Sequence, residues 1–287
     1  NLAQNGNDAQ RERYLPDASE GKTICGMCMS EPDAGTDVMG MRTTARRDGD
    51  HYVLDGAKMW ITNGAISKDE LGDVFLVYAL INGRISAFVV DQDYPGVFSG
   101  QVLHKMGMRS SSMSELVFED CRVPAANLLG DEGGGLAHMM RNLEIERLGL
   151  AAMSLGIARR CVEIMNEYAK DRKSFGEPLN RYGQIQRHIA ESYAEWMAGR
   201  AYTYEYASRM SLDEPGTRLD SDGVKLFCST MGKNVADRAI QVLGGYGYVG
   251  EYRVERLWRD AKLLEIGGGT IEAHQKNMTR DLSRMTK

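Results

Sequence analysis

Cysteine is scarce in this sequence, with five residues among 287, and their scattered positions do not form a disulfide framework. Few cysteines fit a reducing compartment, so we expect a cytoplasmic protein in a bacterium or a mitochondrial-matrix protein in a eukaryote. Cys25 and Cys28 have the spacing of a redox or zinc motif, but no second pair completes a closed zinc site. We therefore expect no metal site and predict that these are buried strand cysteines.

A surplus of positive charge and long apolar runs are also absent. The 35 basic and 40 acidic side chains give a formal net charge of -5, which offers no positive field for nucleic acid or an anionic membrane. No stretch approaches the roughly 18 consecutive apolar residues of a membrane span, and the first residues lack the order of a signal peptide. We expect a soluble protein that is long enough for two structural units.

Short apolar runs separated by Gly, Asp and Asn dominate residues 23–125 and predict a β domain. The runs are residues 52–54, 74–81, 85–90 and 115–118. Asn82 and Gly83 tolerate the positive φ angles of a two-residue hairpin turn. The second and third runs should therefore pair as a hairpin.

After Pro124 the pattern becomes helical, and residues 126–287 are predicted to form a bundle of about four long helices and a short one. The predicted breaks between helices are residues 176–178, 213–216, 244–250 and 267–269. The pattern of residues 1–15 also predicts a helix, which we expect to end before Pro16.

Residues 245–250, GYGYVG, match the dinucleotide fingerprint GxGxxG, but that fingerprint works between a strand and a helix. Here residues 225–243 precede it, and their composition is helical. Gly244 and Gly245 are therefore expected to end a helix, and we assign no Rossmann site.

Two segments could hold a flat polar ligand. The loop MSEPDAGTD, residues 29–37, offers hydroxyls at Ser30 and Thr36 and a bare backbone at Gly35. The segment WITNG, residues 60–64, places an aromatic side chain beside a hydroxyl. Each also has an ordinary reading, as a simple turn and as a core tryptophan at a strand end.

Six segments together resemble the acyl-CoA dehydrogenase family in their order and approximate spacing, and the match runs essentially from end to end. They are residues 29–37, 60–64, 172–176, 241–245, 259–262 and 269–270. The resemblance implies an α+β fold that is acyl-CoA dehydrogenase-like, with a middle β-barrel or sandwich domain followed by a C-terminal helical bundle. It also implies that residues 1–22 are a remnant of an N-terminal helical domain that is largely missing here.

The resemblance further implies an acyl-CoA substrate, FAD shared across a subunit interface, an electron-transferring flavoprotein as partner, and a homo-oligomer expected to be a dimer of dimers. The implied flavin contacts in the β domain are Met27, Ser30, Gly35 and Thr36, with Trp60 and Thr62 at the other edge. Met27 stands where some relatives have an aromatic residue.

The helical domain is implied to hold the rest of the cofactor. The residues that resemble contacts to a neighbouring subunit's FAD are Arg172, Ser174, Phe175 and Gln184. The implied contacts to the adenosine side are Gln241, Val242, Leu243, Gly244 and Gly245, and those to the pyrophosphate and ribose are Thr270 and Glu272. Glu272 stands where some relatives have glutamine.

The reaction needs a carboxylate that removes a proton from the alpha carbon of the acyl group. Most relatives carry a glutamate immediately before a Gly-Thr pair, where this chain has Gly268. The isovaleryl-CoA dehydrogenase branch instead takes its base from a bundle helix, just before an arginine, and Glu146-Arg147 matches that arrangement. Glu144 is two residues away, so about 200° of rotation keeps the two carboxylates on different faces.

We assign Glu146 as the base, with Glu144 or no base at all as the open alternatives, since a helical carboxylate is usually an exposed surface acid. The implied substrate contacts are Glu144, Arg147, Gly267 and Thr36. The backbone N–H of Gly268 is implied to polarise the thioester carbonyl, as in an oxyanion hole.

The expected activity is FAD-dependent alpha,beta-dehydrogenation of a short or branched-chain acyl-CoA to the 2-enoyl-CoA. The absence of a side chain at Gly268 leaves space for a branched acyl group. Two alternatives stay open: a flavin oxidase or nitroalkane-type oxidase on the same fold, and a catalytically impaired, truncated family member.

Overall fold

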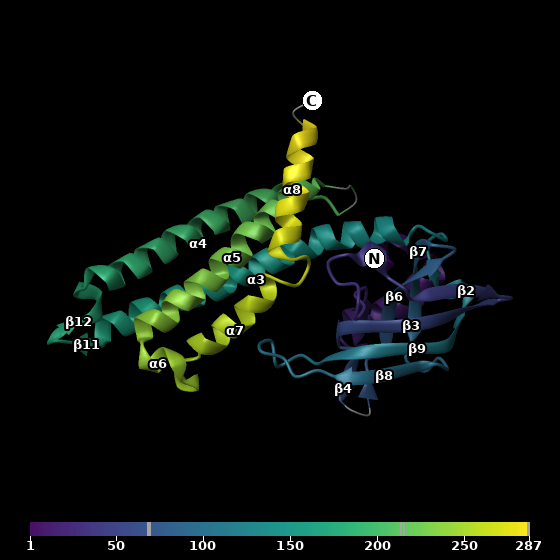
Figure 1. Ribbon diagram of the computed structural model, residues 1–287, viewed down its shortest axis with the longest axis horizontal. Helices are drawn as coiled ribbons and strands as arrows, with labels where there is room; N and C mark the ends of the chain where they lie inside the picture. The colour runs from purple at the N-terminus through teal and green to yellow at the C-terminus, as the bar shows by residue number, and fades with distance from the viewer. Residues whose placement is uncertain (68–69, 213, 215, 286–287) are drawn as a thin grey trace. The chain divides into compact units, whose positions relative to one another are not determined.

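The computed structural model describes residues 1–67, 70–212, 214 and 216–285. The chain divides into two compact units, one of residues 1–105 and 109–142 and the other of residues 106–108 and 143 onward (Figure 1). The domain limits expected from the sequence, 1–22, 23–125 and 126–287, remain predictions.

The described part of the first unit contains an eight-stranded mixed sheet with the order β10-β7-β6-β2-β3-β9-β8, and β1 pairs in parallel with β6. Its strands are β1 (Cys25–Cys28), β2 (Thr44–Asp48), β3 (His51–Thr62), β6 (Val74–Ile81), β7 (Arg84–Asp91), β8 (Val97–Val102), β9 (Met113–Pro124) and β10 (Leu128–Leu129). β4 (Ala65–Ser67) and β5 (Glu70–Leu71) form a separate pair. Buried aromatic rings from four strands, Tyr52, Phe75, Phe88 and Phe118, fill the core of this unit.

The predicted hairpin is confirmed: β6 pairs with β7 in antiparallel register, from Ile81 opposite Arg84 to Val74 opposite Asp91. Asn82 and Gly83 have φ angles of 51° and 76°, which the twist of a two-residue hairpin requires. The sequence reading missed β2 and β8, because β2 is mostly polar and the apolar residues of β8 are interrupted by Ser99, Gly100 and Gln101.

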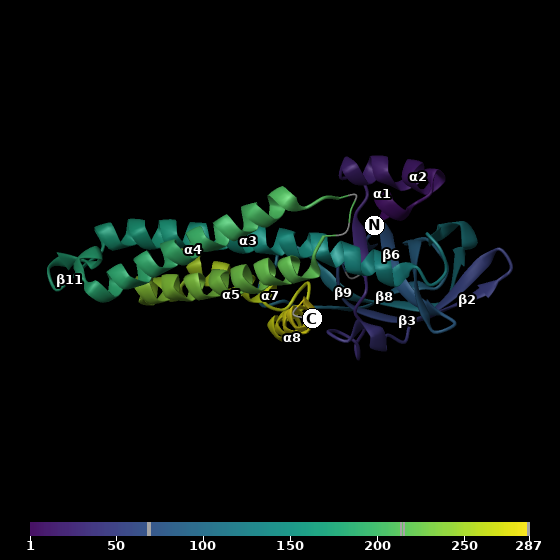
Figure 2. The same cartoon turned by 90° about the horizontal axis from the view of Figure 1, so that it is seen from above.

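The expected single helix at residues 1–15 is wrong in two respects. The segment forms α1 (Leu2–Asn5) and α2 (Asp8–Ser19), because Gly6 is extended and Asn7 starts a new helix through a capping box with Gln10. Pro16 lies inside the last turn of α2 rather than beyond its end. Gln10 donates to the carbonyls of Ala126 and Leu128, and these bonds hold α2 (Figure 2) against the segment around β10.

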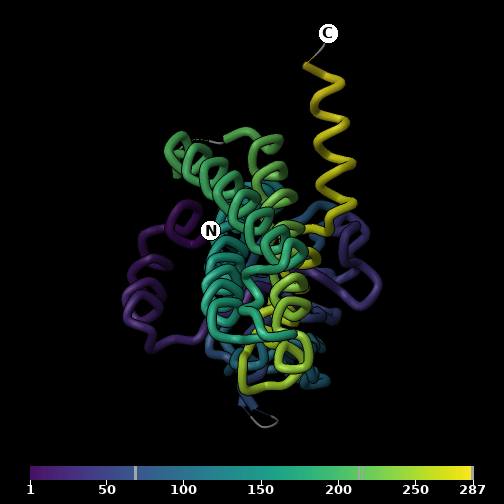
Figure 3. Tube along the Cα trace, turned by 90° about the vertical axis from the view of Figure 1, so that its left-hand side faces the viewer, coloured from purple at the N-terminus to yellow at the C-terminus, as the bar shows by residue number. Residues whose placement is uncertain are grey.

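The second unit is helical, which confirms the predicted bundle. Its helices are α3 (Gly135–Asp171, which starts in the first unit), α4 (Gly183–Arg209), α5 (Arg218–Leu243), α6 (Gly245–Tyr248), α7 (Val254–Leu264) and α8 (Ile271–Met285). Short 3-10 turns are η1 (Val38–Gly40) and η2 (Ala125–Asn127) in the first unit, and η3 (Leu179–Arg181) and η4 (Gly250–Tyr252) in the second. Figure 3 shows the C-terminal end of α8 projecting, while Asp281 of α8 accepts a hydrogen bond of 2.8 Å from Arg218 at the start of α5.

The predicted helix breaks agree with these bounds. Gly244 has a φ of 59° and ends α5, as expected, and α6 begins at Gly245. The hairpin of β11 (Lys173–Ser174) and β12 (Glu177–Pro178) separates α3 from α4. The break expected at 213–216 falls between α4 and α5, although residues 213 and 215 lie outside the described part of the chain.

Small side chains let the helices of the second unit approach closely. A Cβ atom on Gly232 of α5 would lie 3.1 Å from the backbone oxygen of Ser154 on α3, and one on Gly199 of α4 would lie 3.1 Å from Met231. Around them Ala151, Ala158 and Ala236 are fully buried in one apolar core. Among the described residues, none of the helices combines the length and apolar character needed to cross a membrane.

Candidate active site

A run of three glycines, Gly267, Gly268 and Gly269, joins α7 to α8. Gly268 and Gly269 have φ angles of 66° and 108°, a region in which side chains are strained. A Cβ atom on Gly269 would also lie 3.0 Å from the ring of His274. The conformation of the run therefore depends on glycine.

The carboxylate of Glu146 stands beside this run. Glu146 comes from α3, and its Oε1 lies 3.5 Å from the position that a Cβ atom on Gly268 would take. Its Oε2 is buried and has no hydrogen-bond partner among the described residues. Burial raises the pKa of Glu146, and the positive charges of Arg147 and Lys225 oppose that rise only in part. A carboxylate with a raised pKa and one buried oxygen without a partner has the properties of a general base.

The neighbouring carboxylate, Glu144, points elsewhere. It is buried, and its Oε1 accepts a hydrogen bond of 3.2 Å from the hydroxyl of Tyr206 on α4. Burial and the charge of Glu144 raise the pKa of Tyr206. The two carboxylates thus face different neighbours, as a spacing of two residues on a helix requires.

Arg147 is also held within the protein. Its Nη1 lies 2.9 Å from Oδ1 of Asp222, and its Nε donates to the carbonyl of Gly268 over 3.3 Å. Burial lowers the pKa of Arg147, while Asp222 acts to raise it. The assignments of Arg147, Glu144 and Gly267 to substrate binding remain predictions.

The sequence reading did not find Asp222, Lys225 and His274, which surround the glycine run from α5 and α8. Lys225 Nζ donates to the carbonyl of Gly269 over 2.6 Å, and burial together with Arg147 lowers the Lys225 pKa to about 8. One signal was available: Asp222 and Lys225 are three residues apart, so two charges share one helix face. Both side chains are fully buried.

The expected flavin contacts of the first unit gather around Trp60. The backbone N–H of Met59 donates to the carbonyl of Ser30 over 2.9 Å, which ties the loop 30–36 to β3. A Cβ atom on Gly35 would lie 3.8 Å from the indole of Trp60. Trp60 has a φ of 60° and is 49% exposed, so the alternative reading as a core tryptophan is wrong.

The other predicted residues of this group lie on neighbouring segments. Met27 lies on β1, where its sulfur accepts a hydrogen bond from the amide of Asn142. Thr62 is exposed at the end of β3, and Thr36 is exposed in the loop. An exposed indole beside a loop of small residues can cover a flat ring system.

A buried ion pair between Lys58 and Glu31 fixes the loop 30–36. Lys58 Nζ lies 2.8 Å from Oε1 of Glu31, and the Glu31 carboxylate also accepts from the backbone N–H groups of Arg42 and Thr43. Burial acts to raise the pKa of Glu31, but the bonds from Lys58, Thr43 and Arg42 outweigh it and lower the pKa. The loop is therefore fixed by satisfied polar groups.

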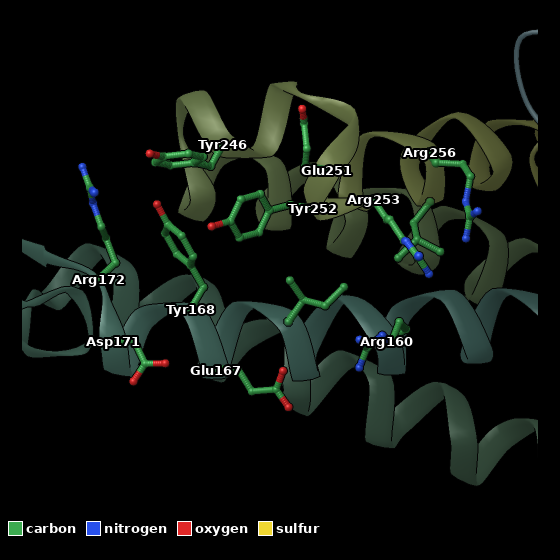
Figure 4. A pocket seen from close by; sticks show the side chains of 12 residues that line it. Arg160, Glu167, Tyr168, Asp171, Arg172, Tyr246, Glu251, Tyr252, Arg253 and Arg256 are labelled. Carbon is green, nitrogen blue, oxygen red and sulfur yellow. The ribbon is translucent and has the colours of Figure 1, made fainter.

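A groove at the other end of the second unit brings Arg172 to the segment after Gly245. The groove has a volume of about 720 Å³ and lies between the end of α3 and the segment from α6 to α7. The guanidinium of Arg172 lies 5.6 Å from the ring centre of Tyr246, which follows Gly245 (Figure 4). Arginines and tyrosines line it, namely Arg160, Arg172, Arg253, Arg256, Tyr168, Tyr246 and Tyr252.

The remaining predicted cofactor residues differ in what they can offer a ligand. Phe175 is 98% exposed at the tip of the β11–β12 hairpin, directly after Ser174, and Gln184 lies in the first turn of α4. Gln241 is exposed, whereas Val242 and Leu243 are buried, so these two can offer only backbone groups.

At the start of α8, Thr270 accepts a hydrogen bond from the backbone N–H of Ala273, and Glu272 is exposed in the first turn. A backbone hydrogen bond and one from Thr270 lower the pKa of Glu272. Both residues thereby stabilise the N-terminus of the helix.

The cysteine prediction is half right. Cys28 is buried and burial raises its pKa to about 12, but Cys25 is exposed, because residues three apart lie on opposite faces of a strand. The part of the chain that the structure describes contains no group of three or more His, Cys, Asp or Glu side chains that could hold a metal ion.

The site thus combines a carboxylate of raised pKa with a run of glycines, in an α+β protein of two units. Two family models match this chain: "Acyl-CoA dehydrogenase, middle domain" over residues 26–121, and "Acyl-CoA dehydrogenase, C-terminal domain" over residues 133–283. The chain belongs to the acyl-CoA dehydrogenase family, which confirms the resemblance and the fold class.

Similar proteins support this membership. The chain is 40% identical over 282 residues to the mitochondrial isovaleryl-CoA dehydrogenase of Pongo abelii, covering 96% of this chain and 65% of that protein. Butyryl-CoA dehydrogenase from Megasphaera elsdenii has a TM-score of 0.92 at 36% identity, over 98% of this chain and 73% of that one. An acyl-CoA dehydrogenase complexed with FAD from Bacillus anthracis has a TM-score of 0.92 at 34% identity, over 99% and 52%.

Proposed function

We propose that the protein is an FAD-dependent acyl-CoA dehydrogenase of the isovaleryl-like branch. It converts a short or branched-chain acyl-CoA to the 2-enoyl-CoA and passes the electrons to an electron-transferring flavoprotein. One observation carries the proposal: the carboxylate of Glu146 lies beside Gly268, with Oε1 3.5 Å from the position of a Cβ atom on that residue and Oε2 buried without a partner among the described residues. The family membership and the similarity to isovaleryl-CoA dehydrogenases support it.

The residues present fit FAD in each unit. In the first unit, the half-exposed indole of Trp60 and the loop at Gly35 offer a flat apolar surface next to hydroxyl and backbone donors. In the second unit, the guanidinium of Arg172 beside Tyr246 suits a pyrophosphate and a neighbouring aromatic base. The chemistry that FAD supplies when bound is acceptance of the hydride from the beta carbon.

The chain's own residues perform the proton transfer. Glu146 accepts the proton of the alpha carbon, so its carboxylate becomes a carboxylic acid while the double bond forms between the alpha and beta carbons. A raised pKa makes that carboxylate a stronger proton acceptor than an exposed glutamate. The backbone N–H of Gly268 donates to the thioester oxygen, on which negative charge develops.

Leu150 fills the space that was expected to be open beside Gly268, so the proposed preference for short or branched acyl groups rests on the shape of an aliphatic wall. Gly268 has no side chain, and the nearest side-chain atom to its Cβ position is Cδ1 of Leu150, at 2.4 Å. The wall beside the reacting carbons is therefore made of an aliphatic side chain and bare backbone. Such a wall selects by shape, and a single methylene changes the preference by about 1–3 kcal/mol.

A panel of acyl-CoAs mixed anaerobically with the FAD-loaded protein tests the proposal. Isovaleryl-CoA, butyryl-CoA and palmitoyl-CoA should bleach the flavin absorbance at rates that fall in that order. Reoxidation should then be fast with electron-transferring flavoprotein and slow with oxygen. Fast reoxidation by oxygen would indicate the oxidase alternative, and no bleaching by any acyl-CoA would indicate a catalytically impaired member.

A further inference from the structure

Asp222 links three helices close to the glycine run, because it lies on α5 and bonds to side chains of α3 and α8. It lies on α5 and is fully buried, and its Oδ1 accepts from Nη1 of Arg147 on α3 at 2.9 Å. The same oxygen lies 2.7 Å from Nδ1 of His274 on α8. Its Oδ2 is buried without a partner among the described residues, so one oxygen holds both donors.

The donors around Asp222 converge on the carbonyls of the run. Arg147 Nε donates to the carbonyl of Gly268, and His274 Nε2 lies 3.0 Å from the carbonyl of Gly269. Lys225 donates to that second carbonyl as well. These side chains are fully or nearly fully buried, and their bonds end on two main-chain oxygens.

A role in stability alone does not explain this arrangement. Burying ionised groups is costly, and apolar side chains of similar volume often stabilise a core as well or better. The benefit of a buried polar network is a fixed geometry. The geometry fixed here is that of Gly268 and Gly269, which have left-handed φ angles and no side chains of their own to anchor them.

We propose that Asp222 and His274 are positioning residues that hold the glycine run against Glu146, through Arg147 and through the carbonyl of Gly269. The inference deepens the proposed function and rests on it for its catalytic consequence. When the carbonyls of the run are fixed, the N–H of Gly268 keeps its direction toward the thioester oxygen while Glu146 faces the alpha carbon. A misplaced donor costs reaction rate rather than substrate affinity.

Two substitutions at one position separate positioning from stability. In His274→Asn the amide nitrogen takes the place of Nδ1, so the bond to Asp222 is kept and the bond to Gly269 is lost. In His274→Gln the amide nitrogen takes the place of Nε2, so the bond to Gly269 is kept and the bond to Asp222 is lost. A role in stability alone predicts the same outcome for both, because each variant loses one buried hydrogen bond.

Hydrogen exchange of the amides at residues 267–271 gives a readout that does not depend on catalysis. His274→Asn should accelerate this exchange about tenfold, as expected for one lost hydrogen bond, while His274→Gln stays near the parent rate. Exchange in the sheet of the first unit is the internal control and should not change in either variant. Equal exchange at 267–271 in both variants would overturn the proposal.

Anaerobic flavin reduction by isovaleryl-CoA gives the second readout. At saturating substrate, His274→Asn should be slower by about tenfold and His274→Gln by less than about threefold, with the substrate dissociation constant of both close to that of the parent. If no acyl-CoA reduces the parent flavin, the proposed function fails and the exchange experiment still decides the positioning role. If the parent is reduced and the two variants react at equal rates, the positioning role fails alone.

Discussion

Two glutamates that burial affects, one in each unit, show that hydrogen-bond partners decide the direction in which the pKa of a carboxylate shifts. Glu31 in the first unit accepts from Lys58 and from two backbone N–H groups, and these bonds lower its pKa despite its burial. Glu146 in the second unit has an oxygen without a partner among the described residues, and burial raises its pKa. The first carboxylate is suited to hold a loop, and the second is suited to accept a proton.

The largest effect on stability is expected where the paired carboxylate loses its cation. Lys58→Met keeps an aliphatic chain of similar length but leaves Glu31 buried with backbone donors only. Breaking a buried pair in this way should lower the free energy of unfolding by about 3–5 kcal/mol, measured by urea denaturation at pH 7. The matched control is Lys22→Met, which removes an exposed cation that pairs with exposed acids and should change stability by less than about 0.5 kcal/mol.

The difference between Lys58→Met and the parent should depend on pH in a fixed direction. The pKa of Glu31 is lower in the folded than in the unfolded protein, so its stabilising contribution is present above the unfolded pKa. That contribution is lost as the pH falls through the folded pKa. A stability difference that grows on acidification would contradict the assignment of Glu31 as the paired carboxylate.

The largest effect on catalysis is expected at the unpaired carboxylate. Glu146→Gln keeps the shape and removes the base, so anaerobic flavin reduction should fall by about a hundredfold or more while FAD binding persists. Glu144→Gln is the matched control on the same helix and should affect substrate affinity more than the reductive step. A Glu146→Gln variant that reduces its flavin at the parent rate would show that the base lies elsewhere.

The same variant tests the sign of the pKa shift. The folded pKa of Glu146 is raised, so ionisation of this group costs stability as the pH rises above its unfolded pKa. Glu146→Gln should therefore be more stable than the parent at neutral pH, and the gain should vanish in acid. The parent rate of flavin reduction should rise with pH through the raised pKa, because the carboxylate is the active form.

A smaller effect is expected from adding a side chain at Gly268, beside Glu146. Gly268→Ala should cost about 1–2 kcal/mol of stability, since a side chain is disfavoured at a φ of 66°. Its Cβ would also collide with Leu150, 2.4 Å away, so Leu150→Ala in the same chain should recover part of the flavin-reduction rate with a branched acyl-CoA. If Gly268→Ala alone reacts as the parent does, the run has more room than the structure shows.

The short distance to Leu150 also limits a glutamate placed at position 268, where most relatives carry their catalytic base. Gly268→Glu combined with Glu146→Gln is expected from the sequence to restore some activity. The structure makes that restoration small, because the new side chain starts in a strained backbone conformation and against Leu150. Any restored rate should remain closer to that of Glu146→Gln than to that of the parent.

The sequence predicted the features that depend on local chemistry or on the family resemblance. The hairpin at Asn82 and Gly83 follows from their tolerance of positive φ, and Glu146 follows from the resemblance of Glu146-Arg147 to a known arrangement. The network at Asp222 and His274 could not be predicted, since these residues are 52 positions apart on two helices and meet only through tertiary packing. Pro16 was misplaced because a proline in the last turn breaks few helical hydrogen bonds.

The smallest effect is expected at Arg172, where the second unit presents an exposed charge instead of a buried one. Its guanidinium lies over Tyr246, and an arginine in that position can pair with a phosphate of FAD. Because the site is open to solvent, Arg172→Ala should weaken FAD binding by only about fivefold, or about 1 kcal/mol, as judged by titrating the apoprotein with FAD.

The matched control for Arg172→Ala is Lys173→Ala, which removes a neighbouring exposed cation and should leave FAD affinity unchanged. If FAD is shared between subunits, as the family resemblance implies, Arg172→Ala should also shift the oligomer toward smaller species in sedimentation at low FAD, and excess FAD should reverse the shift. Equal FAD affinity in the two variants would leave the groove at Tyr246 without a role in cofactor binding.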